Sequence, residues 1–212
     1  MDVFNQVWTV VEAITTVLVI FLFFHDPIRR WNFFGYRPTA VMGLFDPALG
    51  KVLFSKINGA WSFNQGGMYE NNIYVTVETI LKRELGLPET RFKLSYTRPM
   101  GTVRITEQAL VNRARISTVS LFSRARGKGY LACFVRGRLD GVEREMQPGA
   151  GVQEVRIVDF DEARRLVLEH TIGEHRPAKQ RIILRMIDEI EGYARGILEW
   201  ESKHLAPSGV SG

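Results

Sequence analysis

The segment from residue 66 to residue 87 constrains the fold most, because it joins a tight turn to a helix with a defined end. A pair of glycines at its start predicts the turn. Gly86 is typical of the residue that ends a helix, and Pro88 follows just beyond it. Apolar residues recur between these points at helical spacing: Ile73, Val77, Ile80 and Leu81. The segment therefore predicts a loop followed by a helix over residues 73–85.

Strand-like runs lie on both sides of this segment. Runs 39–45 and 51–57 are separated by a turn containing Pro and Gly, which predicts a hairpin. Further strands are predicted over 93–97, 116–122, 130–136 and 152–158. Two more helices are predicted, one after a capped turn at residue 159 and one from Pro177 to about Ser202. Mixed strands with helices at separate points predict an α+β fold, an α/β/α sandwich with a mixed sheet.

Three stretches resemble the Nudix hydrolase superfamily. They are Trp61-Ser62-Phe63-Asn64-Gln65-Gly66-Gly67, Leu81-Lys82-Arg83-Glu84-Leu85-Gly86-Leu87, and Val155 to Ala163, which is similar to the later strand and loop of that fold. The resemblance covers roughly residues 38–200. It implies a Nudix-like sandwich in which helix glutamates hold Mg²⁺ or Mn²⁺ against a diphosphate and water attacks phosphorus.

The chain departs from the family's pattern at the carboxylates. Aligned from Gly86, Glu84 matches the second Glu of the family's Glu-Glu pair, whereas Arg83 replaces the first. Ile80 and Thr79 stand where the family has Glu and Arg, and the loop is shorter, so Glu70 matches only loosely. Residues four apart share a helix face, so carboxylates at 80 and 84 would reach one cation, but Ile80 offers no oxygen. Glu78 lies about 120° around the helix from Glu84 and is a poor substitute.

Two functions follow from this pattern. One is a nucleotide-binding domain, or an accessory or structural subunit of a membrane complex, with a degenerate metal site. The alternative is an active Mg²⁺-dependent hydrolase of nucleoside diphosphate derivatives, with Glu84 as metal ligand and Glu84 and Glu70 as catalytic candidates. Arg83, Arg98 and Arg104 are the candidate substrate-binding residues. One carboxylate makes a poor Mg²⁺ site unless substrate phosphates or distant acids such as Asp161 and Glu162 complete it.

The N-terminal part is a separate feature. Residues 7–24 are almost continuously apolar and would span about 27 Å as a helix, close to the thickness of a bilayer core. No basic residue precedes the run, whereas Arg29 and Arg30 follow it, so we expect a retained single-pass anchor with the C-terminal domain in the cytoplasm. Glu12, the one charge within the run, lies near the interface or pairs with another subunit's helix. The alternative is a core or amphipathic helix of the domain.

These elements divide the chain into three parts. Residues 1–37 form the anchor and an interfacial segment rich in aromatic residues, residues 38–204 form the Nudix-like domain, and residues 205–212 form a flexible tail. Cys133 is the single cysteine, which excludes a disulfide within the chain and fits a reducing compartment. Its apolar neighbours predict a buried thiol.

The middle of the chain is strongly basic. Its cationic residues are Arg91, Lys93, Arg98, Arg104, Arg113, Arg115, Arg124, Arg126, Lys128, Arg136 and Arg138, and the only acid among them is Glu107. Such a field attracts anions: nucleotide phosphates, anionic lipid headgroups or an acidic protein. Binding of nucleic acid is not expected, because the aromatic and basic RNA motifs are missing. The alternative is a scattered basic surface without a single ligand.

Overall fold

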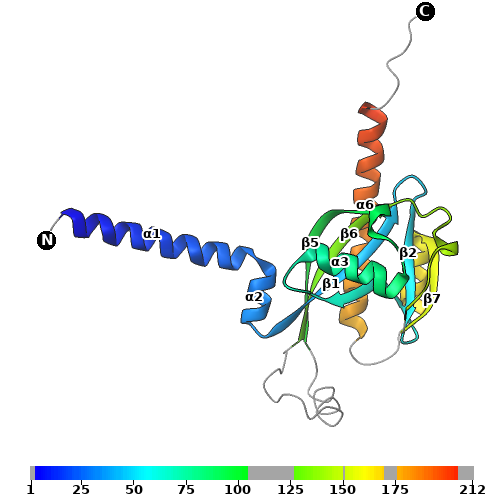
Figure 1. Ribbon diagram of the computed structural model, residues 1–212, viewed down its shortest axis with the longest axis horizontal. Helices are drawn as coiled ribbons and strands as arrows, with labels where there is room; N and C mark the ends of the chain where they lie inside the picture. Colours follow the sequence, from blue (N-terminus) through cyan, green and yellow to red (C-terminus); the bar gives the residue numbers. More distant parts are fainter. Residues whose placement is uncertain (1–2, 105–126, 150, 170–175, 205–212) are drawn as a thin grey trace, which may run out of the picture.

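The computed structural model describes residues 3–104, 127–149, 151–169 and 176–204. Its centre is a mixed sheet with the strand order β3-β2-β1-β6-β5, in which β4 pairs with β1 and β7 with β2 (Figure 1). Only the β1–β6 pair is parallel among these strands. The strands are β1 (Tyr36–Asp46), β2 (Lys51–Ile57), β3 (Ala60–Ser62), β4 (Asn64–Gly67), β5 (Phe92–Arg104), β6 (Gly127–Gly137) and β7 (Val152–Asp159).

The predicted hairpin is confirmed as β1 and β2, which pair antiparallel. Asp46 closes its turn: Oδ1 accepts a hydrogen bond from Ala48 N at 3.0 Å, and Oδ2 accepts one from Leu139 N at 2.9 Å. The predicted strands over 130–136 and 152–158 form parts of β6 and β7. The predicted strand over 93–97 forms part of the longer strand β5. The predicted strand over 116–122 lies outside the described residues.

Helices cover both faces of the sheet, and the predicted α/β/α layering is confirmed. On one face, α3 (Ile73–Ile80) continues as a π-helical turn η1 (Leu81–Leu85); on the other lie α5 (Phe160–Glu169) and α6 (Arg176–His204). The α6 stripe that buries against the sheet includes Ile183, Met186, Ile187 and Ile190. Short 3₁₀ turns occupy η2 (Glu89–Arg91) and η3 (Val142–Arg144).

Cys133 belongs to the core between the sheet and α3. Its side chain is fully buried, as the sequence predicts, and burial raises the pKa of its thiol. Because the thiolate is the reactive form, the low thiolate fraction and the lack of solvent contact both make Cys133 a structural rather than a chemical residue.

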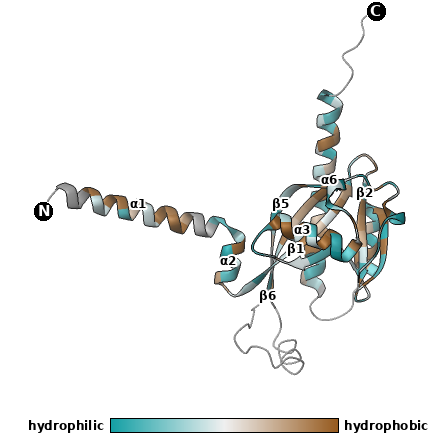
Figure 2. Ribbon diagram, in the orientation of Figure 1, coloured by the Kyte–Doolittle hydropathy of each residue, from teal (hydrophilic) through white to brown (hydrophobic). Residues whose placement is uncertain are grey.

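The N-terminal run forms helix α1 (Val3–His25), which projects from the domain, and Asp26 caps a second helix, α2 (Pro27–Phe33). Apolar side chains are exposed along α1, with Ile14 at 61% and Leu18 at 55% (Figure 2). Over the described residues, no helix combines the length and the apolar character needed to cross a membrane, so the predicted transmembrane helix is not supported. Glu12 accepts a hydrogen bond from the Trp8 indole of the same helix at 2.7 Å.

Candidate functional site

The predicted helix is present, but the predicted turn at the glycine pair is wrong: Gly66 and Gly67 are the last two residues of strand β4, and the turn follows at residues 70–71. β4 pairs with β1 up to the Thr39–Gly67 register, and the chain then turns toward α3. Asn72 caps α3, because its Oδ1 accepts a hydrogen bond from Tyr74 N at 3.0 Å. The helix ends at Gly86, whose φ of 66° places it in the left-handed region that glycine adopts without strain.

Position 80 on this helix is part of the hydrophobic core. Ile80 is 0% exposed and packs with the residues of β1 and β6 that face α3. It also lies directly over Gly66 of strand β4, since a Cβ added at Gly66 would come within 3.1 Å of Ile80 Cγ1. The position at which the family carries a metal-binding Glu is therefore occupied by an apolar side chain that packs the helix against the sheet.

Glu84, the one carboxylate that matches the family's pattern, is held by hydrogen-bond donors. Asn64 Nδ2 donates to Glu84 Oε2 at 3.1 Å, and Ser55 Oγ donates to Asn64 Oδ1 at 2.8 Å. Arg83 Nη2 lies 3.3 Å from Glu84 Oε1. The carboxylate is only 14% exposed, and both of its oxygens have partners. A chain of polar contacts therefore runs from β2 through β4 to η1.

Arg83 connects the helix to the loop. Its Nη1 donates to the Tyr69 hydroxyl at 2.8 Å while its Nη2 contacts Glu84. Glu70 is exposed and has a φ of 51°. Glu78, which spacing makes a poor substitute, is paired with Lys82 at 2.5 Å, and Lys82 also reaches Glu89 at 3.0 Å. Hydrogen bonds from Lys82 to these two carboxylates, Glu78 first, raise the pKa of Lys82.

The residues at this helix do not fit a divalent ion of the kind the family uses. Mg²⁺ needs several oxygen ligands in an octahedral arrangement. Here Glu84 shares its oxygens with Asn64 and a guanidinium, and position 80 offers no oxygen. Among the described residues, no group of three or more His, Cys, Asp or Glu side chains is placed to hold a metal ion. Mg²⁺ therefore remains an expectation of the resemblance alone.

A contact that the sequence did not reveal fixes the end of the helix. Gln147 N donates to the Leu85 carbonyl and Gly149 N donates to the Glu84 carbonyl, both at 3.0 Å. A Cβ on Gly149 would overlap the carbonyl oxygen of Arg83. The segment between η3 and β7 thus supplies the partners that the last helical carbonyls need.

Two of the candidate substrate-binding arginines, Arg83 and Arg98, lie apart in the structure. Arg83 lies on the α3 side of the sheet, whereas Arg98 on β5 pairs with Glu189 of α6 at 3.3 Å on the opposite side. The side chain of Arg104 lies outside the described residues. Arg83 and Arg98 therefore lie on opposite sides of the sheet, and the assignment of these arginines to substrate binding stays a prediction.

The distant acids are also engaged elsewhere. Asp161 pairs with Arg164 at 2.8 Å, and Glu162 pairs with Arg165 at 2.5 Å, both within α5. The hydrogen bond from Arg165 lowers the pKa of Glu162. Because α5 covers the face of the sheet opposite α3, neither acid completes the Glu84 site.

Much of the described part of the basic region is paired with acids. Arg91 contacts Glu145 at 2.5 Å, and Arg136 contacts Glu201 at 2.7 Å. Arg113, Arg115, Arg124 and Arg126 lie outside the described residues. The predicted anion-attracting field is therefore weakened, where it can be described, by ion pairs within the domain.

The described residues form a mixed sheet between helical layers, with strand β4 leading through a turn into helix α3 on one face. The crystal structure of an Ap4A hydrolase binary complex from Caenorhabditis elegans is similar at a TM-score of 0.50 and 9% identity, covering 76% of this chain and 98% of that one. This chain has the Nudix fold.

A Nudix hydrolase from Mycobacterium smegmatis is similar at a TM-score of 0.46 and 13% identity, covering 73% of this chain and 86% of that one. No protein-family model matches the sequence, and no curated protein matches it. The similarity to known proteins is therefore one of fold.

Proposed function

We propose that this chain is a Nudix-fold binding or accessory protein that does not use the family's metal-dependent hydrolysis. The observation that carries the proposal is the state of the two positions that should hold the ion. Ile80 is buried in the core, and Glu84 is bound to Asn64 and Arg83. The helix positions at which the Nudix family places metal ligands therefore contribute to the stability of this fold instead.

The ligand class that we propose is a nucleotide with a diphosphate or polyphosphate group. The support is the shared fold with an Ap4A hydrolase, together with Arg83, whose side chain is 59% exposed beside the loop. A guanidinium donates paired hydrogen bonds to phosphate oxygens and needs no metal to do so.

A hydrolysis and binding panel tests this function. The full chain and Glu84→Gln are incubated with nucleoside diphosphate derivatives and Mg²⁺ or Mn²⁺, and product is measured beside equilibrium binding. We expect no turnover above background in either protein and saturable binding that a chelator leaves unchanged. Turnover by the native chain that disappears in Glu84→Gln would instead identify an active hydrolase. Absence of both turnover and binding would contradict the proposed nucleotide ligand and leave only the accessory role.

We further propose that α1 associates with a lipid membrane and leaves the domain on the cytoplasmic side. The support is that exposed apolar side chains occur on all sides of the helix, at positions such as Val7, Val19 and Ile20. A helix that is apolar all round is found in a protein core or in a membrane, and α1 stands outside the core. The arginines that follow it suit an anionic inner leaflet.

A further inference from the structure

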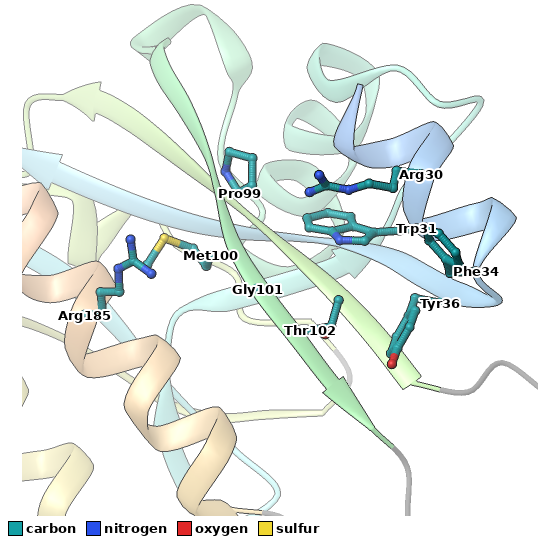
Figure 3. Close-up of a pocket in the computed structure, with 9 residues that line it drawn as sticks. All are labelled: Arg30, Trp31, Phe34, Tyr36, Pro99, Met100, Gly101, Thr102 and Arg185. Atoms are coloured by element: carbon teal, nitrogen blue, oxygen red, sulfur yellow. The ribbon is translucent and has the colours of Figure 1, made fainter. Parts of the chain in front are cut away.

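A cavity of about 500 Å³ lies beside α2, away from the Glu84 site (Figure 3). It is bounded by α2, the first residue of β1, the middle of β5 and one residue of α6. Its lining residues are Arg30, Trp31, Phe34, Tyr36, Pro99, Met100, Gly101, Thr102 and Arg185. Such a volume is within the range of small-molecule sites.

The walls of the cavity are held in place by the sheet. Trp31 is buried, and a Cβ on Gly129 of β6 would overlap its ring. Because Gly129 has no side chain, α2 can pack closely on the sheet at this point. The register of β5 against β6 shifts between Pro99 and Gly101, and Gly101 has a φ of 122°. A β-bulge re-aims side chains, and this one lies at the cavity.

The lining is cationic and aromatic. It contains two arginines and three aromatic side chains, and none of its lining residues is acidic. Among the described residues, no side chain pairs with the Arg30 guanidinium, and Figure 3 shows it reaching toward Pro99. Arg185 donates from Nε to Glu189 at 2.9 Å and keeps its two Nη groups for other partners. Glu189 is shared with Arg98, so the surroundings keep an excess of positive charge.

The cavity lies close to the end of α1. Helix α2 begins two residues after α1 ends, with only Asp26 between them. If α1 enters a bilayer, as proposed above, then Arg30, Trp31 and Phe34 lie at the level of the lipid headgroups, where aromatic and basic residues concentrate. A ligand that combines a phosphate with an apolar part would be available there.

We propose that this cavity binds the phosphate headgroup of an anionic phospholipid. Arg30 donates charge-assisted hydrogen bonds to the phosphate oxygens, and Arg185, which Figure 3 shows beside Met100 on the other side of β5, adds positive charge to the cavity. The Trp31, Phe34 and Tyr36 rings contact the glycerol and the first carbons of the acyl chains. The biological role of this site rests on the proposed membrane association of α1, whereas its ligand chemistry rests on the lining residues alone.

Calorimetric titration of the full chain in a mild detergent tests the proposal, with protein-free detergent micelles as reference. The probes are dihexanoyl phosphatidic acid, dihexanoyl phosphatidylcholine, glycerol 3-phosphate and AMP. We expect saturable binding of the phosphatidic acid, weakened at least about tenfold in Arg30→Gln/Arg185→Gln. The matched control is Arg29→Gln/Arg181→Gln, which removes the same charge from α2 and α6 outside the cavity and should leave the affinity unchanged.

Two results would overturn the proposal. Equal losses in the cavity variant and in the matched control would mean that only net charge matters. Binding of AMP or glycerol 3-phosphate as tight as that of the phosphatidic acid would mean a site for soluble phosphates. Dispersed lipid reaches the cavity from solution whether or not α1 enters a bilayer, so failure here is separate from failure of the proposed membrane association.

Discussion

Ile80→Glu is expected to lower the free energy of unfolding by at least about 3 kcal/mol, although it restores the spacing of the family's metal-binding carboxylates. The side chain at this position is 0% exposed and lies over Gly66, so a carboxylate there would be buried without a partner. Glu84, one turn away, would add like-charge repulsion rather than compensate. Urea unfolding of the full chain, followed by circular dichroism, measures the difference.

Two controls accompany this variant. Ile80→Val removes one methylene from the same contact and should cost only about 0.5–1.5 kcal/mol. Thr79→Glu places the same carboxylate on the adjacent, half-buried position and should be tolerated better. If Ile80→Glu kept native stability and became more stable when Mg²⁺ was added, position 80 would be a metal position missing one ligand, and our interpretation would be wrong.

Ile14→Arg/Leu18→Arg is expected to move most of the protein from the membrane fraction to the supernatant. Both side chains are exposed on α1, so the change leaves the domain intact. An arginine near the centre of a membrane-embedded helix costs about 2.5–3.5 kcal/mol, and two of them on neighbouring turns outweigh much of the gain from burying α1. Fractionation of cells that express the full chain, with a carbonate wash, gives the measurement.

The matched control places two arginines at exposed apolar positions of the domain. Leu49 and Leu198 are also exposed, and Leu49→Arg/Leu198→Arg should stay with the membrane fraction. Deletion of residues 1–30 should release the protein as well. Retention of this deletion variant on membranes would contradict the proposed role of α1.

Local patterns in the sequence were sufficient for the elements whose structure depends on neighbours along the chain. The hairpin of β1 and β2, the helix ending at Gly86 and the long helix α6 follow from apolar spacing and from glycine or proline at their ends. The parallel pairing of β1 with β6 was not predictable in this way, because it joins segments far apart in the sequence. Asp26 as the cap of a separate helix α2 was also missed, although Asp before Pro is a signal for it.

The candidate site was predicted in part. Alignment by Gly86 correctly marked Ile80 as a residue without a ligand oxygen, but it could not show that Ile80 is buried or that Asn64 binds Glu84. Such contacts depend on how close strand β4 and the helix lie in the folded domain. The separation of Arg83 from Arg98 was missed for a related reason: a count of basic residues along the chain does not indicate the face of the sheet on which each lies.

Titration of the full chain with Mn²⁺, with the free ion followed by electron paramagnetic resonance, tests most directly whether the helix has lost its metal site. The native chain and Glu84→Gln are compared without nucleotide. We predict that neither protein binds Mn²⁺ in the submillimolar range, because Glu84 is held by Asn64 and Arg83. The signal of the free ion should therefore be the same with both proteins. A saturable one-to-one site in the native chain that disappears in Glu84→Gln would contradict the account.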